Sequence, residues 1–506
     1  MPNNELDEKN FSEPKLPLAT PIVGFALAVI LGFFLSKSQG FSNGYAIDDY
    51  FNRFAESAGV IDFVLSQGRF TWALYVKLLS LAGLNQLDFG VIGMFLLGVA
   101  SAFFYIVAFR PLLSTRSNFL VAVCASFLLG VHPYFTEYVS FRITLMPMAI
   151  MMALCACAVL YFDRFLRDGG RNELLIALVS AVFAIGANQL ALSFLATGIF
   201  LRSGIVRAIE QGDSESWKSV TSALIRSVIF LVCAIALYYV VVLATTSGAG
   251  AAAGSDKRAT MLAVSEIPSR LMLVGKQIWT IVQENENFLS RTAKVLILLS
   301  MGIAFFAAII SEPKRALLGL AVVAIIFVLA LLPVSIAAVW WPAPRTLIAI
   351  PMAFSAGILF WTRGFAKPSV SSGVVVAALG LTCMLLAVHS SKILLNQQRL
   401  NRWDMQLAAQ IASRAGERFP NAKSLAVVGA PYAYGIDPQM PSGDMNLSAL
   451  SVPYAIDPLF EEATGRQLEI RLAPELVAEC SSRKSFPDDE GIFVKGEETV
   501  ICMASK

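Results

Sequence analysis

The stretch ATPIVGFALAVILGFFLSK, residues 19–37, carries no charge before its last residue. A helix of about 20 apolar residues is long enough to cross the hydrocarbon core of a bilayer. Similar runs recur along most of the chain and predict about eleven spans. These spans are 19–37, 89–109, 118–132, 143–162, 173–187, 190–203, 223–245, 293–311, 315–335, 345–361 and 372–392. The chain is therefore predicted to be an α-helical polytopic membrane protein.

The overall composition agrees with that prediction. Of the 506 residues, 56% are hydrophobic and only 15% are charged, whereas soluble domains carry about 25% charged residues. Residues 173–201 form one long apolar run with GANQL in its middle, which predicts two short helices that turn at Asn188 and Gln189. Residues 70–86 are polar at their edges, so we expect them to form a helix at the membrane interface.

Basic residues give the orientation of the bundle. Short loops rich in lysine and arginine alternate along the chain with the other connections. These loops are FRPLLSTRSN, DRFLRDGGRNE, LRSGIVRAIEQGDSESWKS, EPKRA and TRGFAKP. Because such loops stay in the cytoplasm, we expect the N-terminal tail, 1–18, to be cytoplasmic. The loops 38–88 and 246–292 and the end of the chain then face outward.

The composition changes after the last predicted span. A polar helix at 396–417 is expected, followed by strands near 424–429, 468–472 and 492–503. A transmembrane domain over 19–393 is thus predicted to carry a small α/β domain over 394–506. Cys480 and Cys502 both lie in that domain. In an oxidising compartment they could form a disulfide, and two free thiols are the alternative.

Polar residues recur in the segments predicted to face outward. NGYAIDDYFNRF, residues 43–54, places Asp48, Asp49 and Arg53 just after the first span. Asp49 and Arg53 are four residues apart and would share one face of a helix. These three residues could serve a chemical function, or they could be a helix cap with an ion pair.

Three other outward segments carry similar groups. SQGRF, residues 66–70, contains Arg69, and WWPAPRT, residues 340–346, contains Arg345. HPYFTEYVSFR, residues 132–142, brings further polar groups: His132, Tyr134, Glu137, Tyr138 and Arg142. Each residue alone has an ordinary explanation as a helix end, a solvated loop residue or an interface anchor. Their recurrence on one side is what predicts a site.

Carboxylates and arginines at the outer face of a membrane fit one reaction well. An arginine binds two phosphate oxygens at once, and an aspartate can remove a proton from a hydroxyl. Together they predict glycosyl transfer from a lipid-linked sugar phosphate. No nucleotide-binding motif is present in the sequence. The alternatives are a membrane transporter or flippase, a glycan polymerase or ligase, and a non-catalytic scaffold.

The same residues carry a family resemblance. IDDYFNR, QGRF, the stretch HPYFTEYVSFR and PRT at 344–346 resemble segments of the Gtr-type glucosyltransferases of bacterial O-antigen modification, within the GT-C class of polyprenyl-dependent transferases. The resemblance covers residues 20–365. The family usually has an aspartate shortly after the position of Arg142, and FRITLMP has none.

The resemblance implies inverting transfer of a monosaccharide, glucose first among them, from a polyprenyl-phosphate donor to a lipid-linked glycan such as O-antigen. Asp48 or Asp49 would be the general base, with Asp49 preferred, and the other acid would orient the acceptor or bind a divalent cation. The donor phosphate would meet arginines and Lys276, which lies on an amphipathic stretch of the loop 246–292. The substrate-binding candidates are Arg53, Arg69, His132, Tyr134, Glu137, Arg142, Asn188, Gln189, Lys276 and Arg345.

The resemblance also gives a location and a set of partners. The protein is expected in the bacterial inner membrane, with its C-terminal domain in the periplasm. Its partners would be the two lipid-linked saccharides and the bilayer, and no nucleic acid. The resemblance implies no certain cofactor and leaves a metal ion open.

Overall fold

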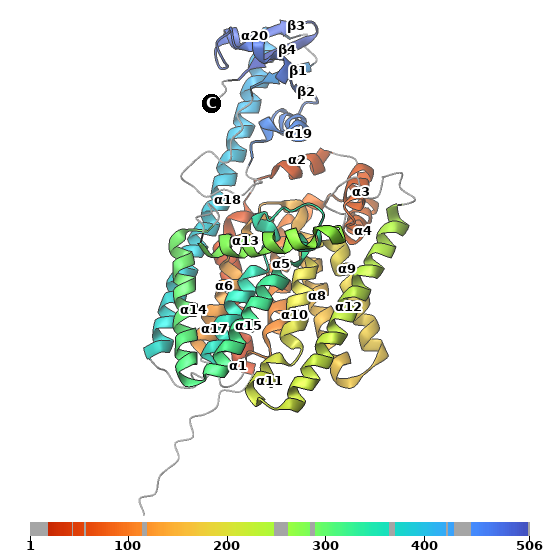
Figure 1. Cartoon of the computed structure of the whole chain (residues 1–506). Helices are drawn as coiled ribbons and strands as arrows, with labels where there is room; N and C mark the ends of the chain where they lie inside the picture. The colour runs from red at the N-terminus through yellow and green to blue at the C-terminus, as the bar shows by residue number, and fades with distance from the viewer. Residues whose placement is uncertain are drawn as a thin grey trace, which may run out of the picture.

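The structure is a computed structural model that describes residues 19–42, 44–54, 57–113, 119–246, 262–283, 289–363, 370–420, 424–429 and 447–503. The predicted N-terminal tail, 1–18, lies outside these residues, as does part of the predicted loop 246–292. Within them, the chain forms a helical bundle that carries a small mixed domain at one end (Figure 1).

Each predicted span coincides with a helix of the bundle. The helices are α1 (Ala19–Lys37), α5 (Gly90–Phe109), α6 (Phe119–Val131), α8 (Arg142–Asp168), α9 (Arg171–Ala187), α10 (Ala191–Arg202), α12 (Ser214–Thr246), α14 (Arg291–Ser311), α15 (Pro313–Ala330), α17 (Ile350–Thr362) and α18 (Val370–Arg418). The predicted break at Asn188 and Gln189 is confirmed, since α9 ends and α10 begins on either side of it.

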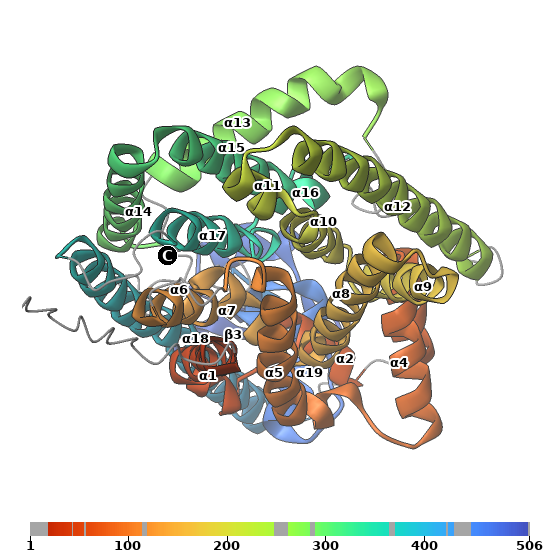
Figure 2. The same ribbon diagram turned by 90° about the horizontal axis from the view of Figure 1, so that it is seen from below.

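Two helices of the bundle are not among those long and apolar enough to cross a membrane. Among the described residues, nine helices are long and apolar enough to cross a membrane, compared with about eleven predicted spans. α6 and α10 have only 13 and 12 residues, but they count among the nine because their helical stretches continue to Val139 and Gln211. α9 and α17 are not among the nine, with 17 and 13 residues, whereas a crossing needs about 20. α17 lies inside the bundle against α6, α14 and α15 (Figure 2), and all of its 13 residues are buried.

Shorter helices connect the long ones. They are α2 (Ile47–Phe54), α3 (Ser57–Ser66), α4 (Phe70–Leu81), α7 (Pro133–Val139), α11 (Ile205–Gln211), α13 (Ile267–Gln283) and α16 (Leu332–Ile336). The helices α2, α3, α4 and α13 lie at the end of the bundle that carries the C-terminal domain (Figure 1). The predicted interfacial helix at 70–86 corresponds to α4, which ends at Leu81.

The amphipathic stretch of the loop 246–292 forms α13, which lies crosswise over the end of the bundle (Figure 1). Arg270 attaches it to α16 and to the segment that follows, because its guanidinium donates to the carbonyls of Val334 and Ala338, both at 2.9 Å. Leu271 and Trp279 are exposed. Val274 and Ile281 are buried against the bundle, so α13 packs on the protein with one side and presents apolar side chains outward with another.

The short basic loops meet one another through ion pairs. Arg202 at the end of α10 contacts Asp163 of α8. Arg363 after α17 contacts Glu210 of α11 at 2.9 Å. Residues of three loops assigned to the cytoplasm therefore lie together at the end of the bundle away from α2 and α13.

The helix α18 joins the two parts of the chain. The span 372–392 and the polar helix 396–417 were predicted as separate helices with a domain boundary at 393, but they form one helix of 49 residues. No glycine or proline interrupts residues 381–415, so nothing in the backbone breaks the hydrogen-bond ladder. The predicted boundary therefore falls inside α18.

The C-terminal domain contains a four-stranded sheet in the order β2-β1-β4-β3. Its elements are β1 (Ser424–Val428), α19 (Pro453–Thr464), β2 (Glu469–Leu472), α20 (Val477–Cys480), β3 (Ile492–Lys495) and β4 (Glu498–Cys502). β1 pairs in parallel with β2 and β4, whereas β3 is antiparallel to β4. The single strand predicted over 492–503 is therefore a hairpin, and Gly496 has the positive φ of 63° that its tight turn requires.

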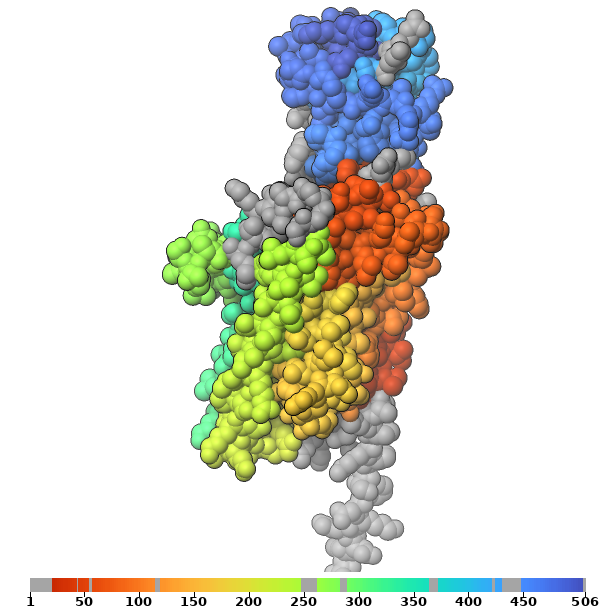
Figure 3. All heavy atoms as spheres, turned by 90° about the vertical axis from the view of Figure 1, so that its right-hand side faces the viewer, coloured from red at the N-terminus to blue at the C-terminus, as the bar shows by residue number. Residues whose placement is uncertain are grey.

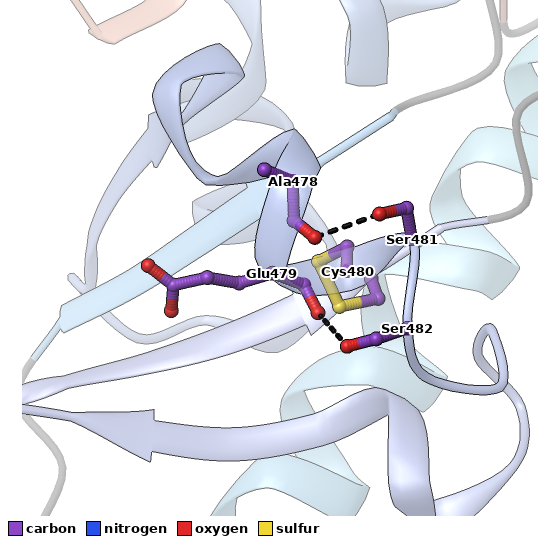
Figure 4. The surroundings of a disulfide bond; sticks show 6 residues. Ala478, Glu479, Cys480, Ser481 and Ser482 are labelled. Carbon is purple, nitrogen blue, oxygen red and sulfur yellow. Dashed lines mark hydrogen bonds between the residues drawn. A yellow bond between two sulfur atoms is a disulfide. The ribbon is translucent and has the colours of Figure 1, made fainter.

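The two cysteines of this domain are bonded to each other. The disulfide between Cys480 and Cys502 ties α20 to β4 (Figure 4), which decides between the two alternatives left open by the sequence. The hydroxyls of Ser481 and Ser482 donate to the carbonyls of Ala478 and Glu479 just before the bond. The disulfide therefore joins the two ends of a 22-residue stretch that includes the β3–β4 hairpin.

Candidate functional site

The two adjacent acids of α2 lie in different surroundings. Asp48 is partly exposed and lines a cavity, whereas Asp49 is fully buried. Successive side chains of a helix are about 100° apart around the axis, so neighbours in the sequence face different parts of the protein. The structure thus separates the roles of two residues that the sequence presents as a pair.

Asp49 binds backbone N–H groups with both of its oxygens. Oδ2 accepts from Ala46 at 2.9 Å and from Arg142 at 3.2 Å, and Oδ1 accepts from Ile143 at 3.1 Å. Arg142 and Ile143 begin α8, and the first N–H groups of a helix have no partner inside it. Burial raises the pKa of Asp49 to about 7, although these N–H groups lower it. Contrary to our preference for Asp49 as the base, it lies outside the cavity lining and caps α8.

Asp48 is connected to residues from other parts of the chain. Its Oδ1 accepts a hydrogen bond of 2.9 Å from the hydroxyl of Tyr454 in α19. One turn further on, Asn52 donates to the backbone carbonyl of Asp48 at 2.7 Å and accepts from Gln86 at 2.9 Å. Gln86 accepts in turn from the indole of Trp72 at 3.1 Å. This chain of hydrogen bonds fixes α2 against α4 beside the cavity.

Arg69 reaches the cavity because of a tight turn before it. Gly68 has a φ of 75°, and a side chain there would clash with the hydroxyl of Tyr238. The turn ends α3 and places Arg69 at the start of α4. Its guanidinium carbon lies 5.3 Å from the ring centroid of Trp72, and Nε donates to Gln189 at 3.5 Å.

Arg345 is held by an acid of another segment. Glu137 of α7 is 1% exposed and accepts from the backbone N–H of Arg345 at 2.7 Å and from its Nη1 at 3.4 Å. The guanidinium carbon also lies 4.3 Å from the ring centroid of Trp341. The carboxylate and the indole together fix the arginine in one orientation.

These groups surround a cavity of about 520 Å³ between α2, α4, α7 and the segment around Arg345. A smaller cavity of about 130 Å³ adjoins it and shares Arg69, Asn188 and Arg345 in its lining. The polar residues that line one or both are Asp48, Asn52, Gln67, Arg69, Tyr138, Thr144, Asn188, Gln189, Arg345, Thr346 and Tyr454.

The structure brings five of the predicted residues together at the cavities. They are Asp48, Arg69, Asn188, Gln189 and Arg345. They come from segments separated by as many as 297 positions in the chain. Asp49 and Glu137 lie behind the lining as buried supports for α8 and for Arg345.

Two predicted arginines lie outside the cavity lining. Arg53 forms a 2.8 Å ion pair with Glu462 of the C-terminal domain. Arg142 donates to the carbonyl of Ser42 at 3.1 Å, and its guanidinium lies 5.4 Å from the ring of Tyr45. Both therefore connect segments at the end of the bundle that carries the C-terminal domain, rather than facing the cavities.

The remaining three candidates are also outside the lining. His132 and Tyr134 are fully buried at the start of α7, where Nδ1 of His132 accepts from the N–H of Tyr134 at 3.4 Å. His132 is therefore a buried residue at a helix end, which is the ordinary alternative given for it in the sequence analysis. Lys276 is exposed on α13. A site role for these three is not supported by their positions.

Some residues of the lining were not among the candidates. Tyr138 was noted in HPYFTEYVSFR but was not assigned to the substrate. Gln67 and Trp72 are sequence neighbours of Arg69, so a wider window around that arginine would have included them. Tyr454 had no such signal, because it follows Asp48 by 406 positions and belongs to another domain.

The described residues do not form a metal site from protein ligands alone. Among the described residues, no group of three or more histidine, cysteine, aspartate or glutamate side chains lies close enough to hold one. The two acids of α2 do not act together either, because both oxygens of Asp49 face N–H groups. We therefore assign no step of the reaction to a cation.

The sequence model of one family, glucosyl transferase GtrII, matches residues 37–362, more than half of the chain. The chain belongs to this family. Among curated proteins, no match was found. The matched segment includes α2, Arg69, α7 and Arg345, and it ends before α18. Membership confirms the resemblance and makes the protein a membrane-embedded glucosyltransferase.

Proposed function

We propose that this glucosyltransferase takes glucose from a polyprenyl-phosphate donor and transfers it to a lipid-linked glycan such as O-antigen, on the periplasmic side of the bacterial inner membrane. One observation carries the proposal: Asp48, Arg69 and Arg345 line the same cavity at one end of the helical bundle. A base for the acceptor and two cations for the leaving group are what this reaction needs.

The two arginines would bind the donor phosphate. A polyprenyl chain stays in the bilayer, so its phosphate lies at the boundary where the bundle ends. Arg69 and Arg345 both line the smaller cavity as well as the larger one, and each lies beside a tryptophan ring. Arginines held in place before the substrate binds need little reorganisation as charge develops on the departing phosphate. The exposed apolar face of α13 supports a location on the bilayer surface beside them.

Asp48 would be the general base. It takes the proton from an acceptor hydroxyl as that oxygen attacks C1 of glucose. The bond between C1 and the phosphate oxygen breaks, and polyprenyl phosphate leaves with the electron pair. A single displacement inverts the configuration at C1. Retention would need a second carboxylate as nucleophile, and Glu137 is buried and bound to Arg345.

The proposal can be tested with the purified full-length protein in lipid nanodiscs. Synthetic polyprenyl-phosphate-glucose, the mannose and galactose analogues and UDP-glucose are offered with lipid-linked glycan extracted from membranes of the source bacterium. We expect transfer from the first donor, release of polyprenyl phosphate, and a product of inverted anomeric configuration by NMR. Transfer from UDP-glucose alone, or a retained configuration, would overturn the proposal.

The side of the membrane needs a separate test. Single cysteines replace Arg466 in the C-terminal domain and Arg164 in the basic end of α8, both exposed. An impermeant maleimide applied to intact spheroplasts should label position 466 and leave position 164 unlabelled. The reverse pattern would place the cavity in the cytoplasm.

A further inference from the structure

The C-terminal domain reaches the cavity through α19. This domain lies outside the segment matched by the family, yet Tyr454 on α19 lines the cavity beside Asp48. Its hydroxyl donates to Asp48 at 2.9 Å, and its ring meets the ring of Phe51 edge-on, with 6.2 Å between centroids. The domain therefore contributes to the lining of the cavity in addition to being attached to the bundle through α18.

A packed interface holds this part of the lining in place. Ile47 and Tyr50 on the buried face of α2 belong to the same hydrophobic core as Leu459 and Phe460 of α19. The segment α2–α4 lies between the helical bundle and the C-terminal domain (Figure 3). Because one face of α2 packs on α19, its other face and Tyr454 keep a fixed relation to the cavity.

The Asp48 end of the cavity differs in chemistry from the arginine end. Its lining includes three aromatic residues in contact with one another, Phe51, Phe63 and Tyr454. The Tyr454 side chain is 46% exposed, so its ring is accessible. Carbohydrates combine apolar ring faces with hydroxyl groups, and an aromatic wall beside an acid offers a surface for both. Arg69 and Arg345 line the adjoining smaller cavity, which Asp48 and Tyr454 do not reach.

We propose that α19 forms the acceptor subsite, in which the ring of Tyr454 packs against a sugar of the acceptor glycan and its hydroxyl orients Asp48. This inference rests on the proposed function and adds the region that recognises the acceptor. It divides the site into a donor half built by the family segment and an acceptor half completed by the C-terminal domain. Differences among α19 sequences would then change the acceptor without changing the donor.

Kinetics of two variants test the proposal. Tyr454→Ala removes the ring and the hydroxyl, and Tyr454→Phe removes only the hydroxyl. The assay titrates the extracted lipid-linked glycan at fixed polyprenyl-phosphate-glucose, and then the reverse. We expect Tyr454→Ala to raise the acceptor KM about tenfold, a factor typical of one lost stacking contact, and to change the donor KM less than twofold. In Tyr454→Phe, the main effect should be a lower kcat.

Val494→Ala is the matched control, because Val494 is exposed on β3 and outside the cavity lining. Thermal unfolding of each variant checks that the domain stays folded. An unchanged acceptor KM in Tyr454→Ala, or an equal rise in both KM values, would overturn the inference.

A binding measurement separates this inference from the proposed function. If the wild type transfers nothing from polyprenyl-phosphate-glucose, the proposed function fails. Binding of the extracted glycan to the wild type and to Tyr454→Ala, measured by calorimetry without donor, still decides the role of α19. A tenfold weaker affinity in the variant supports the acceptor subsite, and equal affinities contradict it.

Discussion

The two ends of the helical bundle use the same charged residue types in different ways. At the end formed by the basic loops, Arg202 contacts Asp163 and Arg363 contacts Glu210, and these pairs join neighbouring helices. At the other end, Arg69 and Arg345 line a cavity and lie beside tryptophans. The comparison teaches that an arginine near a membrane surface indicates a site only when space for a ligand remains next to it.

The same contrast separates the neighbours Asp48 and Asp49. Asp49 satisfies three backbone N–H groups and has no surface left for a substrate. Asp48 faces the cavity. The following predictions test whether residues at the cavity affect turnover and their counterparts elsewhere affect stability.

Replacement of Asp48 should have the largest effect. Asp48→Asn keeps the shape of the side chain and removes its basicity, so glucose transfer should fall by about 10²–10⁴-fold, the contribution of a general base. Thermal unfolding should be nearly unchanged. The matched variant Asp163→Asn at the other end should lower the unfolding temperature and leave turnover of the folded protein unchanged. Glucose transfer by Asp48→Asn at the rate of the wild type would contradict a catalytic role for Asp48.

Loss of Arg69 should affect the donor. Arg69→Ala removes a charged hydrogen-bond donor, a loss of about 1.5–3 kcal/mol, and should raise the donor KM by about 10–100-fold. The acceptor KM should change much less. Arg363→Ala is the control, because Arg363 pairs with Glu210 and lies outside both cavities. A larger effect on the acceptor than on the donor would contradict a phosphate role.

Asp49→Asn should act on stability and should depend on pH. An amide cannot accept from all three N–H groups, so unfolding should become easier by about 1–3 kcal/mol. The pKa of Asp49 is raised from 3.8 to about 7 in the fold, so the protonated acid is favoured there and stability from this group is lost as pH rises from about 4 to 7. The advantage of the wild type over the variant in thermal unfolding should therefore shrink over that range. A stability advantage of the wild type that grows with pH would contradict this prediction.

The ion pair between Arg53 and Glu462 should contribute least. Both side chains are partly exposed, 39% and 23%, and such pairs are worth about 0.2–1 kcal/mol. A double-mutant cycle with Arg53→Ala and Glu462→Ala, followed by thermal unfolding, should give a coupling in that range. A coupling of several kcal/mol would mean that charge, rather than the packed core, holds α19 on α2.

Much of the architecture followed from the sequence because membrane spans depend on local composition. An apolar run such as 19–37 has to form a helix in lipid, where no water satisfies its backbone groups, and α1 has those bounds. The break at Asn188 and the strands of the C-terminal domain were also local signals. The prediction of two separate helices, 372–392 and 396–417, was wrong. The polar residues continue the helix of the span without a break, and both segments belong to α18.

The sequence by itself determined that the chain is a helical membrane protein and which of its segments carry acids and arginines. Only the tertiary structure decided that Asp48 rather than Asp49 faces the cavity, and that Arg53 and Arg142 connect segments. Only the tertiary structure brought Tyr454 next to Asp48 across 406 positions. The physical reason is that hydropathy is a sum over neighbouring residues, whereas a site depends on side-chain direction and on the packing of helices far apart in the chain.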